Sequence, residues 1–143
     1  MDKQAMHLLA FDLGAESGRA ILGKFNGECL ELSEIHRFSN GPTRLPAPGG
    51  KQQLRWNVLN LWNEIQRGIA MASKSCEIAG IGIDTWGCDF GLFDRQDQLI
   101  GNPFHYRDDR TDGMLEEAFR RSSRQAIFAQ TGIQFMQLNT LYQ

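Results

Sequence analysis

The chain has 143 residues, of which 41% are hydrophobic and 22% are charged, as expected for a globular protein with a core of its own. Its net charge of −2 comes from 15 basic and 17 acidic residues with no block of one sign. This charge distribution gives no electrostatic reason to expect nucleic-acid binding. No apolar run approaches the roughly 20 residues that a membrane-spanning helix needs, so we expect a cytoplasmic protein without a membrane partner.

The three cysteines, Cys29, Cys76 and Cys88, are widely spaced and form no C-x-x-C pair. This spacing favours neither a disulfide framework nor a zinc site. Each cysteine lies in an apolar or strand-like stretch, so we predict buried, reduced thiols.

The first predicted element is a buried strand over residues 8–11, which ends at Asp12 where the chain turns. Gly14 and Gly18 bracket three small or polar residues, and a second strand is predicted over residues 19–25. The pattern predicts two strands joined by a short turn whose size suits a bound phosphate group.

The sequence of this turn has two interpretations. The turn forms either an anion-binding nest, with Ser17 and Arg19 as donors and Asp12 beside a metal-bound water, or a tight β-turn with a surface aspartate. The P-loop pattern is excluded because the glycines are too close together, and the Rossmann pattern because Glu16 stands where its second glycine is needed.

A hairpin is predicted at Asn26-Gly27, with a third strand over residues 28–38 that carries a bulge or an edge position near Ser33. Residues 39–53 are rich in proline and glycine, which predicts an exposed loop without regular structure. We interpret this loop as an insertion rather than as a lid.

An amphipathic helix is predicted next, after a short strand over residues 54–56. Asn57 is its expected N-cap. Apolar residues then recur at helical spacing, and we expect them, Trp62 included, to face the core: Val58, Leu61, Trp62, Ile65, Ile69 and Ala72.

A buried strand is predicted over residues 78–84, and it again ends on a carboxylate, Asp84. Strands over residues 88–94 and 99–100 follow. The order of three strands, a helix and a parallel strand predicts an α/β fold with a mixed sheet flanked by helices.

Two further stretches carry candidate chemistry. The turn at Trp86-Gly87 offers an aromatic face and a close backbone approach that suit a sugar, although a structural turn explains it equally well. Residues 103–110 are dense in charge and form either a sugar-contacting loop or a solvated loop of ion pairs. Towards the end of the chain, Asp112 is the expected cap of one helix, and Ser122 with Gln125 forms a capping box for a second helix that ends near Gly132.

The opening motif of Asp12, Gly14, Ser17 and Arg19 resembles the phosphate hairpin of the FGGY carbohydrate kinases, members of the actin-like ATPase superfamily. Within that family the chain is most similar to the L-rhamnulokinase group. The stretches that carry this similarity are residues 82–90, 106–111, 131–135 and 139–143.

The resemblance implies a ribonuclease H-like fold and use of ATP and Mg²⁺. It implies that Ala15, Glu16, Ser17, Gly18 and Arg19 contact the ATP phosphates and that Asp12 faces the metal, although the carboxylate of Glu16 departs from the small hydroxyl residue expected there.

For the sugar, L-rhamnulose, the resemblance implies a contact from Gly87, and we expect Trp86, Tyr106 and Arg107 to position the same ketose. Residues 1–143 are then the partial N-terminal domain of a kinase that phosphorylates this ketose at O1, with the catalytic base beyond Gln143. The alternatives are a kinase for xylulose, fuculose or glycerol, and a non-catalytic nucleotide-binding fragment.

Overall fold

The structure, a computed structural model, describes residues 5–143, which divide into two compact units. Unit 1 comprises Met1–Pro42, described from residue 5, and Asn57–Trp86, and unit 2 comprises Thr43–Trp56 and Gly87–Gln143. No helix among the described residues is both long and apolar enough to cross a membrane.

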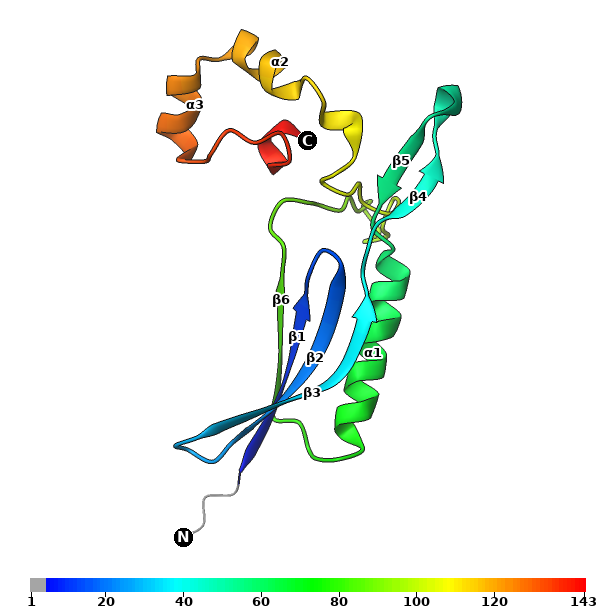
Figure 1. Cartoon of the computed structure of the whole chain (residues 1–143), viewed down its shortest axis with the longest axis vertical. Coiled ribbons are helices and arrows are strands. Elements are labelled where there is room, and N and C mark those ends of the chain that lie inside the picture. The colour runs from blue at the N-terminus through cyan, green and yellow to red at the C-terminus, as the bar shows by residue number, and fades with distance from the viewer. Residues whose placement is uncertain (1–4) are drawn as a thin grey trace. The chain divides into compact units, whose positions relative to one another are not determined.

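Unit 1 is built on a four-stranded mixed sheet of order β3-β2-β1-β6 (Figure 1). Its strands are β1 (Met6–Leu13), β2 (Ser17–Phe25), β3 (Leu30–Ser39) and β6 (Gly80–Thr85). The first three pair antiparallel, whereas β6 lies parallel to β1. The predicted α/β fold with a mixed sheet is confirmed.

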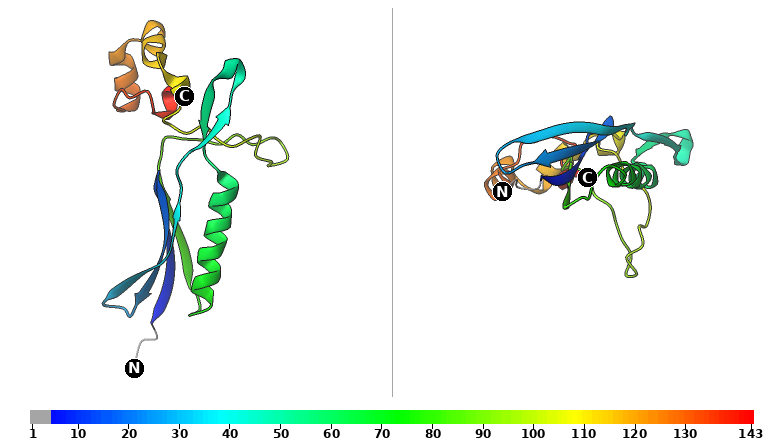
Figure 2. Two further views of the ribbon diagram at one scale, coloured as in Figure 1. Left: turned by 45° about the vertical axis from the view of Figure 1, so that its right-hand side comes forward. Right: turned by 90° about the horizontal axis from the view of Figure 1, so that it is seen from below.

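Helix α1 (Val58–Ser73) covers one face of this sheet (Figure 2). Asn57 caps it as predicted, because its side chain accepts a hydrogen bond from the Asn60 N–H at 3.0 Å. The core lies between helix and sheet, and it is formed by Leu9, Phe11, Leu13, Ala20, Phe38, Leu61, Ile65 and Ala72.

Burial predictions on α1 and on β6 are wrong. Trp62 is 57% exposed, because the buried stripe of α1 runs through Leu61 and Ile65 and leaves Trp62 about 100° around the helix. The strand predicted over residues 78–84 forms, but Ile81 and Ile83 are exposed because β6 is the edge strand of the described sheet.

The hairpin between β2 and β3 forms as predicted, with a loop over residues 26–29. The Asn26 side chain stabilises this loop by accepting the N–H groups of Glu28 and Cys29 at 2.9 and 2.8 Å. Cys29 is exposed, which contradicts the predicted burial of that thiol. The expected bulge is present two residues further on, where Ile35 is the extra residue opposite the Ala20/Ile21 step of β2.

Unit 2 begins with a hairpin where an irregular loop was predicted. Strands β4 (Thr43–Pro46) and β5 (Gln52–Arg55) pair antiparallel around a short 3₁₀ helix, Pro48–Gly50. The prediction is wrong because Pro46 occupies the last position of its strand, and Gly49 and Gly50 adopt positive φ in the connecting turn.

The rest of unit 2 carries α2 (Met114–Arg121), α3 (Arg124–Thr131) and 3₁₀ helices at Asp109–Thr111 and Thr140–Tyr142. The strand predicted over residues 88–94 does not form; a single bridge joins Phe93 to Leu99. The predicted caps are also displaced, since Gly113 precedes α2 in place of Asp112. Ser123, rather than Ser122, caps α3, which ends at Gly132 as predicted.

Candidate functional site

The turn between β1 and β2 is held by hydrogen bonds within unit 1. The Gly14 N–H donates to the Ser17 carbonyl at 3.0 Å. Asn40, just beyond β3, donates its backbone N–H to the Glu16 carbonyl at 2.9 Å and its side-chain amide to the Gly14 carbonyl at 2.7 Å. The predicted turn of Gly14 to Gly18 is therefore fixed from the adjoining strand.

A row of four charged residues crosses the sheet beside this turn. Arg37 pairs with Arg19, Arg19 with Asp12, and Asp12 with Asp84, one residue from each strand. Directly paired residues share a face of a sheet, and this face is the one opposite α1, since Phe11 and Ala20 on the other face enter the core. The row brings two carboxylates and two guanidinium groups to the carboxyl end of β1.

One ion pair lies within this row, and a second joins the row to Glu34. Asp12 accepts a hydrogen bond from Arg19, and both side chains are partly exposed. Arg37 pairs with Glu34 through its Nε at 2.9 Å and donates to the Ser17 Oγ at 3.5 Å. The hydrogen bonds from Arg37 lower the pKa of Glu34, and the pKa of Arg37 is raised mainly by Glu34, with a contribution from Asp12. The face thus combines cationic donors with one carboxylate engaged by Arg19.

The composition of this site fits a magnesium-bound phosphate group. Arg19 and the turn supply donors for phosphate oxygens, and Asp12 supplies an oxygen ligand of the kind that Mg²⁺ prefers. No group of three or more His, Cys, Asp or Glu among residues 5–143 can hold a metal ion. Mg²⁺ is usually bound through one or two carboxylates together with water and substrate phosphates.

The two glycines of the turn lie in crowded surroundings. A Cβ on Gly14 would lie 2.9 Å from the Ser17 carbonyl oxygen, and a Cβ on Gly18 would overlap the ring of Phe38. Between them, Ala15 and Ser17 are partly buried, whereas Glu16 is exposed. The Phe38 ring therefore leaves no room for a side chain at position 18.

The residues implied as sugar contacts are divided between the two units. Trp86 is partly buried and packs against the core cluster of unit 1. Gly87, the first residue of the second segment of unit 2, is exposed, with open space where a Cβ would lie. Tyr106 and Arg107 lie together in unit 2, where the Arg107 guanidinium is 5.3 Å from the centre of the Tyr106 ring.

Asp89 holds the segment that carries Tyr106. One carboxylate oxygen accepts the Trp56 indole N–H at 2.5 Å and the Tyr106 N–H at 3.1 Å, while the other accepts the Gln143 side-chain amide at 2.9 Å. Asp108 is buried and accepts the N–H groups of Leu54 and Arg110 at 2.6 and 3.0 Å. Both carboxylates accept hydrogen bonds from other residues of this chain, so they hold the segment in position.

His105 lies beneath the same segment, with 1% of its surface exposed. Its ring stacks on Tyr106 and lies 4.2 Å from the ring centre of Trp56, and its Nδ1 accepts the Arg107 N–H at 3.0 Å. Nε2 is then the protonated nitrogen of the neutral ring, and it has no hydrogen-bond partner among the described residues. Burial lowers the pKa of His105 below 6.5, against a smaller opposing effect of Asp89.

Unit 2 is expected to lose stability as the pH falls below about 6.5. In that range the unfolded chain binds a proton at His105 that the folded chain does not, so protonation favours unfolding. The measurement is the urea midpoint between about pH 7.5 and 5.5, followed by Trp56 fluorescence in a background with Trp62 and Trp86 replaced by phenylalanine. A His105→Asn variant is expected to show a shallower slope, whereas His7→Asn, in unit 1, keeps the original slope. Equal slopes in all three proteins would contradict the assignment to His105.

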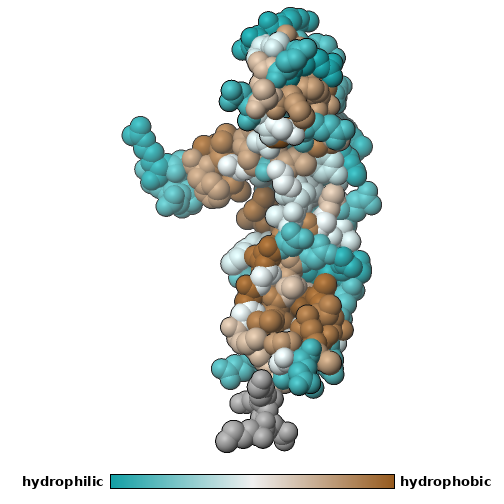
Figure 3. All heavy atoms as spheres, turned by 90° about the vertical axis from the view of Figure 1, so that its left-hand side faces the viewer, coloured by the Kyte–Doolittle hydropathy of each residue, from teal (hydrophilic) through white to brown (hydrophobic). Residues whose placement is uncertain are grey.

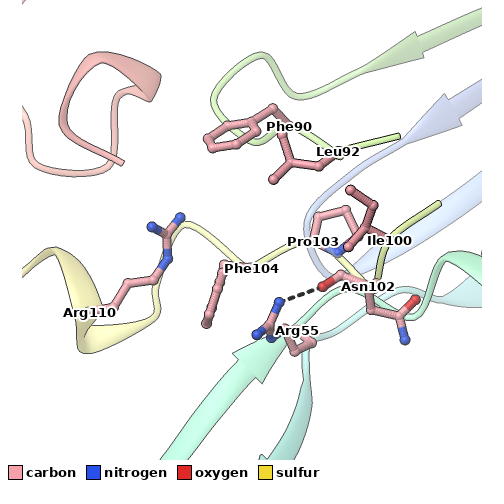
Figure 4. Close-up of a pocket in the computed structure, with 9 residues that line it drawn as sticks. Arg55, Phe90, Leu92, Ile100, Asn102, Pro103, Phe104 and Arg110 are labelled. Atoms are coloured by element: carbon pink, nitrogen blue, oxygen red, sulfur yellow. Dashed lines mark hydrogen bonds between the residues drawn. The ribbon is translucent and has the colours of Figure 1, made fainter. Parts of the chain in front are cut away.

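A pocket of about 440 Å³ lies in unit 2 and contains none of the predicted sugar residues (Figure 4). Phe104 stands between two guanidinium groups, with those of Arg55 and Arg110 at 3.3 and 4.3 Å from its ring centre. Arg55 also donates to the Asn102 carbonyl at 2.7 Å, and Phe90 and Leu92 line the opposite wall in the view of Figure 4. A second pocket, of about 400 Å³, includes Arg107 in its lining.

Sequence reasoning did not identify four residues that lie beside or support the turn of Gly14 to Gly18: Arg37, Phe38, Asn40 and Asp84. Asp84 carried a signal, because it ends a strand on a carboxylate as Asp12 does. Only the parallel pairing of β1 with β6 shows that these two carboxylates are neighbours.

The chain is similar to kinases of carbohydrates and of glycerol. The model of the FGGY family of carbohydrate kinases, N-terminal domain, matches residues 7–143. A gluconate kinase and a xylulose kinase from Lactobacillus acidophilus are each 18% identical to the chain, with TM-scores of 0.74 and 0.73, and cover 97% and 96% of it. A Plasmodium falciparum glycerol kinase solved with ADP is 18% identical, with a TM-score of 0.69 over 96% of the chain.

The chain spans 27% of the length of each of the two Lactobacillus kinases and 28% of the Plasmodium kinase. At 18% identity these likenesses establish the fold, and they confirm the expected actin-like ATPase architecture. The family assignment rests on the match over residues 7–143, which includes the turn of Gly14 to Gly18, the charged row and all of unit 2. The chain therefore belongs to the FGGY family of carbohydrate kinases and corresponds to the N-terminal domain of that family.

Proposed function

We propose that residues 1–143 are the N-terminal part of an ATP-dependent kinase in which the turn of Gly14 to Gly18 binds the phosphates of ATP. The observation that supports this proposal is the row of Arg37, Arg19, Asp12 and Asp84 beside a turn whose carbonyl groups are engaged by the chain. Cationic groups beside a tight turn stabilise a polyphosphate, and a neighbouring carboxylate holds the metal that such a ligand carries.

The residues have separate roles in this proposal. Ala15 to Arg19 contact phosphate oxygens, with the Arg19 guanidinium neutralising their charge, and Asp12 faces a magnesium ion. Glu16 is exposed and repels phosphate unless its carboxylate points away, so its backbone rather than its side chain takes part. Mg²⁺ supplies charge neutralisation between the phosphates.

The proposed acceptor is L-rhamnulose, which receives the γ-phosphoryl group at O1. Gly87 contacts this ketose, as the resemblance to the rhamnulokinase group implies, and Trp86, Tyr106 and Arg107 position it. Asp89 positions the Tyr106 backbone and is therefore not the base that removes the hydroxyl proton. We place that base, the rest of the nucleotide pocket and the domain that closes over the sugar outside these 143 residues, in a cytoplasmic enzyme.

Coupled ATP turnover tests this proposal in the complete protein that carries the chain. The acceptors are L-rhamnulose, D-xylulose, L-fuculose, glycerol and gluconate, each assayed with Mg·ATP. We expect kcat/KM for L-rhamnulose to exceed that for every other acceptor by at least about 100-fold, since specificity of this size follows from paired hydroxyl groups in a built site.

The possible outcomes separate the parts of the proposal. Preference for another acceptor overturns the choice of L-rhamnulose and leaves the kinase assignment intact. ATP binding without turnover on any acceptor favours a non-catalytic nucleotide-binding protein. Turnover by the 143-residue chain alone contradicts the placement of the base outside it.

A further inference from the structure

Asn40 is a buried polar residue next to the phosphate turn, with 6% of its surface exposed. It follows directly on β3 and reaches the turn with both of its amide groups. The side-chain amide donates to the Gly14 carbonyl at 2.7 Å, and the backbone N–H donates to the Glu16 carbonyl at 2.9 Å. Neither bond belongs to a strand ladder or a helix.

These bonds determine which backbone groups of the turn are available to a ligand. Together with the bond from the Gly14 N–H to the Ser17 carbonyl, they engage the carbonyl oxygens of Gly14, Glu16 and Ser17 within the chain. A free carbonyl oxygen carries partial negative charge and repels phosphate, whereas backbone N–H groups attract it. The N–H of Ala15 takes no part in these three bonds.

The segment around Asn40 supports the turn from a second direction. Phe38, two residues earlier on β3, is 8% exposed and fills the space where a side chain on Gly18 would lie. Phe38 is held in turn by the core and by a tilted contact with His36 at 5.5 Å. The end of β3 therefore fixes both ends of the turn.

We propose that Asn40 is a positioning residue for nucleotide binding, which acts through the Gly14 and Glu16 carbonyls and does not itself touch the phosphates. It orders the turn before ATP arrives, so that binding does not have to order it. The inference rests on the proposed kinase function, since it assigns a role to Asn40 within that phosphate site.

The test compares steady-state kinetics of Asn40→Ala with the wild type in the complete kinase. We expect the KM for ATP to rise about tenfold, the loss that one buried hydrogen bond gives. The kcat and the KM for the sugar are expected to stay within about threefold, because the nucleotide that does bind reorders the turn.

A matched control is Asn26→Ala. Asn26 also caps a turn of unit 1 with its side chain, but that turn joins β2 to β3 at the opposite end of both strands. We expect this variant to leave the KM for ATP unchanged. An equal rise in both variants would show a general loss of folding and would overturn the positioning role.

Asn40→Asp gives a second readout that a purely structural role would not produce. The carboxylate has the size of the amide but cannot donate to the Gly14 carbonyl, whereas a protonated carboxyl group can. Relative to the wild type at the same pH, its KM for ATP is therefore expected to recover as the pH falls from about 8 to about 5. Asn40→Ala should show no such recovery.

The failures of the two proposals are distinguishable. A wild-type protein that does not use ATP contradicts the proposed function. A wild-type protein that uses ATP, with Asn40→Ala showing an unchanged KM for ATP, contradicts the inference about Asn40 alone.

Discussion

Replacing Asp12 by asparagine is expected to lower magnesium-dependent phosphoryl transfer in the complete kinase on the order of 100-fold. The same change is expected to raise the affinity of the 143-residue chain for tripolyphosphate in EDTA about two- to fivefold. The two effects have opposite signs because Asp12 favours the metal and opposes the bare anion. Coupled ATP turnover measures the first effect, and calorimetric titration with tripolyphosphate, with and without Mg²⁺, measures the two affinities.

The ion pair between Asp12 and Arg19 is the reason for the second effect. In the absence of ligand the Arg19 guanidinium is engaged by Asp12, so a metal-free phosphate competes with a carboxylate for it. Asparagine removes this competitor and keeps the size of the side chain. Arg19→Ala is expected to weaken tripolyphosphate binding whether or not Mg²⁺ is present.

Glu31→Gln is the control for net charge. Glu31 lies on β3 near the opposite end of the sheet, where it pairs with Lys24 at 3.9 Å. Its replacement removes one negative charge from unit 1 and should leave both affinities unchanged. Weaker metal-free binding by Asp12→Asn would show that Asp12 does not compete for Arg19.

Replacing Gly18 by alanine is expected to destabilise unit 1 by about 1–3 kcal/mol, the cost of overpacking a core. The added Cβ overlaps the Phe38 ring, which is buried against the sheet and cannot move away without disturbing the core. The urea midpoint of unit 1 measures this loss, followed by Trp86 fluorescence in a background with Trp56 and Trp62 replaced by phenylalanine.

Gly82→Ala is the matched control, since Gly82 also lies in a strand of this sheet but has no atom within 4 Å of the added Cβ. It is expected to change stability by less than about 0.5 kcal/mol. The double variant Gly18→Ala with Phe38→Leu should recover part of the loss, because the smaller side chain makes room. Equal destabilisation by both glycine replacements would contradict the steric explanation.

The sequence predicted local features of unit 1 well, because they depend on neighbouring residues. The positions of the turn after Asp12, the Asn26-Gly27 hairpin and the Asn57 cap each follow from residues a few positions apart, although the support of the turn comes from Phe38 and Asn40. The neighbours of the turn depend on pairing between distant strands. Asp84 lies beside Asp12 only through the parallel register of β1 and β6, which no local pattern specifies.

Burial was predicted less well, for a reason visible on α1. Glu64 lies on the buried stripe of the helix, where a carboxylate is not expected. It is accommodated by His36 at 2.7 Å and by Arg67 at 2.9 Å. The hydrophobic pattern predicted Trp62 in the buried stripe of α1. Hydropathy alone does not reveal that His36, on β3, can pair with Glu64.

One face of the sheet has a different character at each end. The charged row lies towards the carboxyl end of β1, and exposed hydrophobic side chains lie at the other end, where Figure 3 shows them gathered in the lower part of the view. By strand pairing, the members on this face are Met6, Leu8, Leu30 and Leu32. Leu8 belongs to the strand over residues 8–11 that was predicted to be buried, but it is exposed because helix α1 covers only the opposite face.

The bulge in β3 determines how this strand tolerates changes in length. Side chains alternate between the two faces along a strand, and the extra residue Ile35 shifts that alternation by one position. Beyond it, Phe38 faces the core and Arg37 joins the charged row. Removal of Ile35 alone would place Glu34 and His36 next to each other opposite Ile21 and Ala20. A regular strand one residue shorter would therefore keep Phe38 on the core face and Arg37 in the charged row, so the bulge can absorb the loss of one residue without moving the support of the turn.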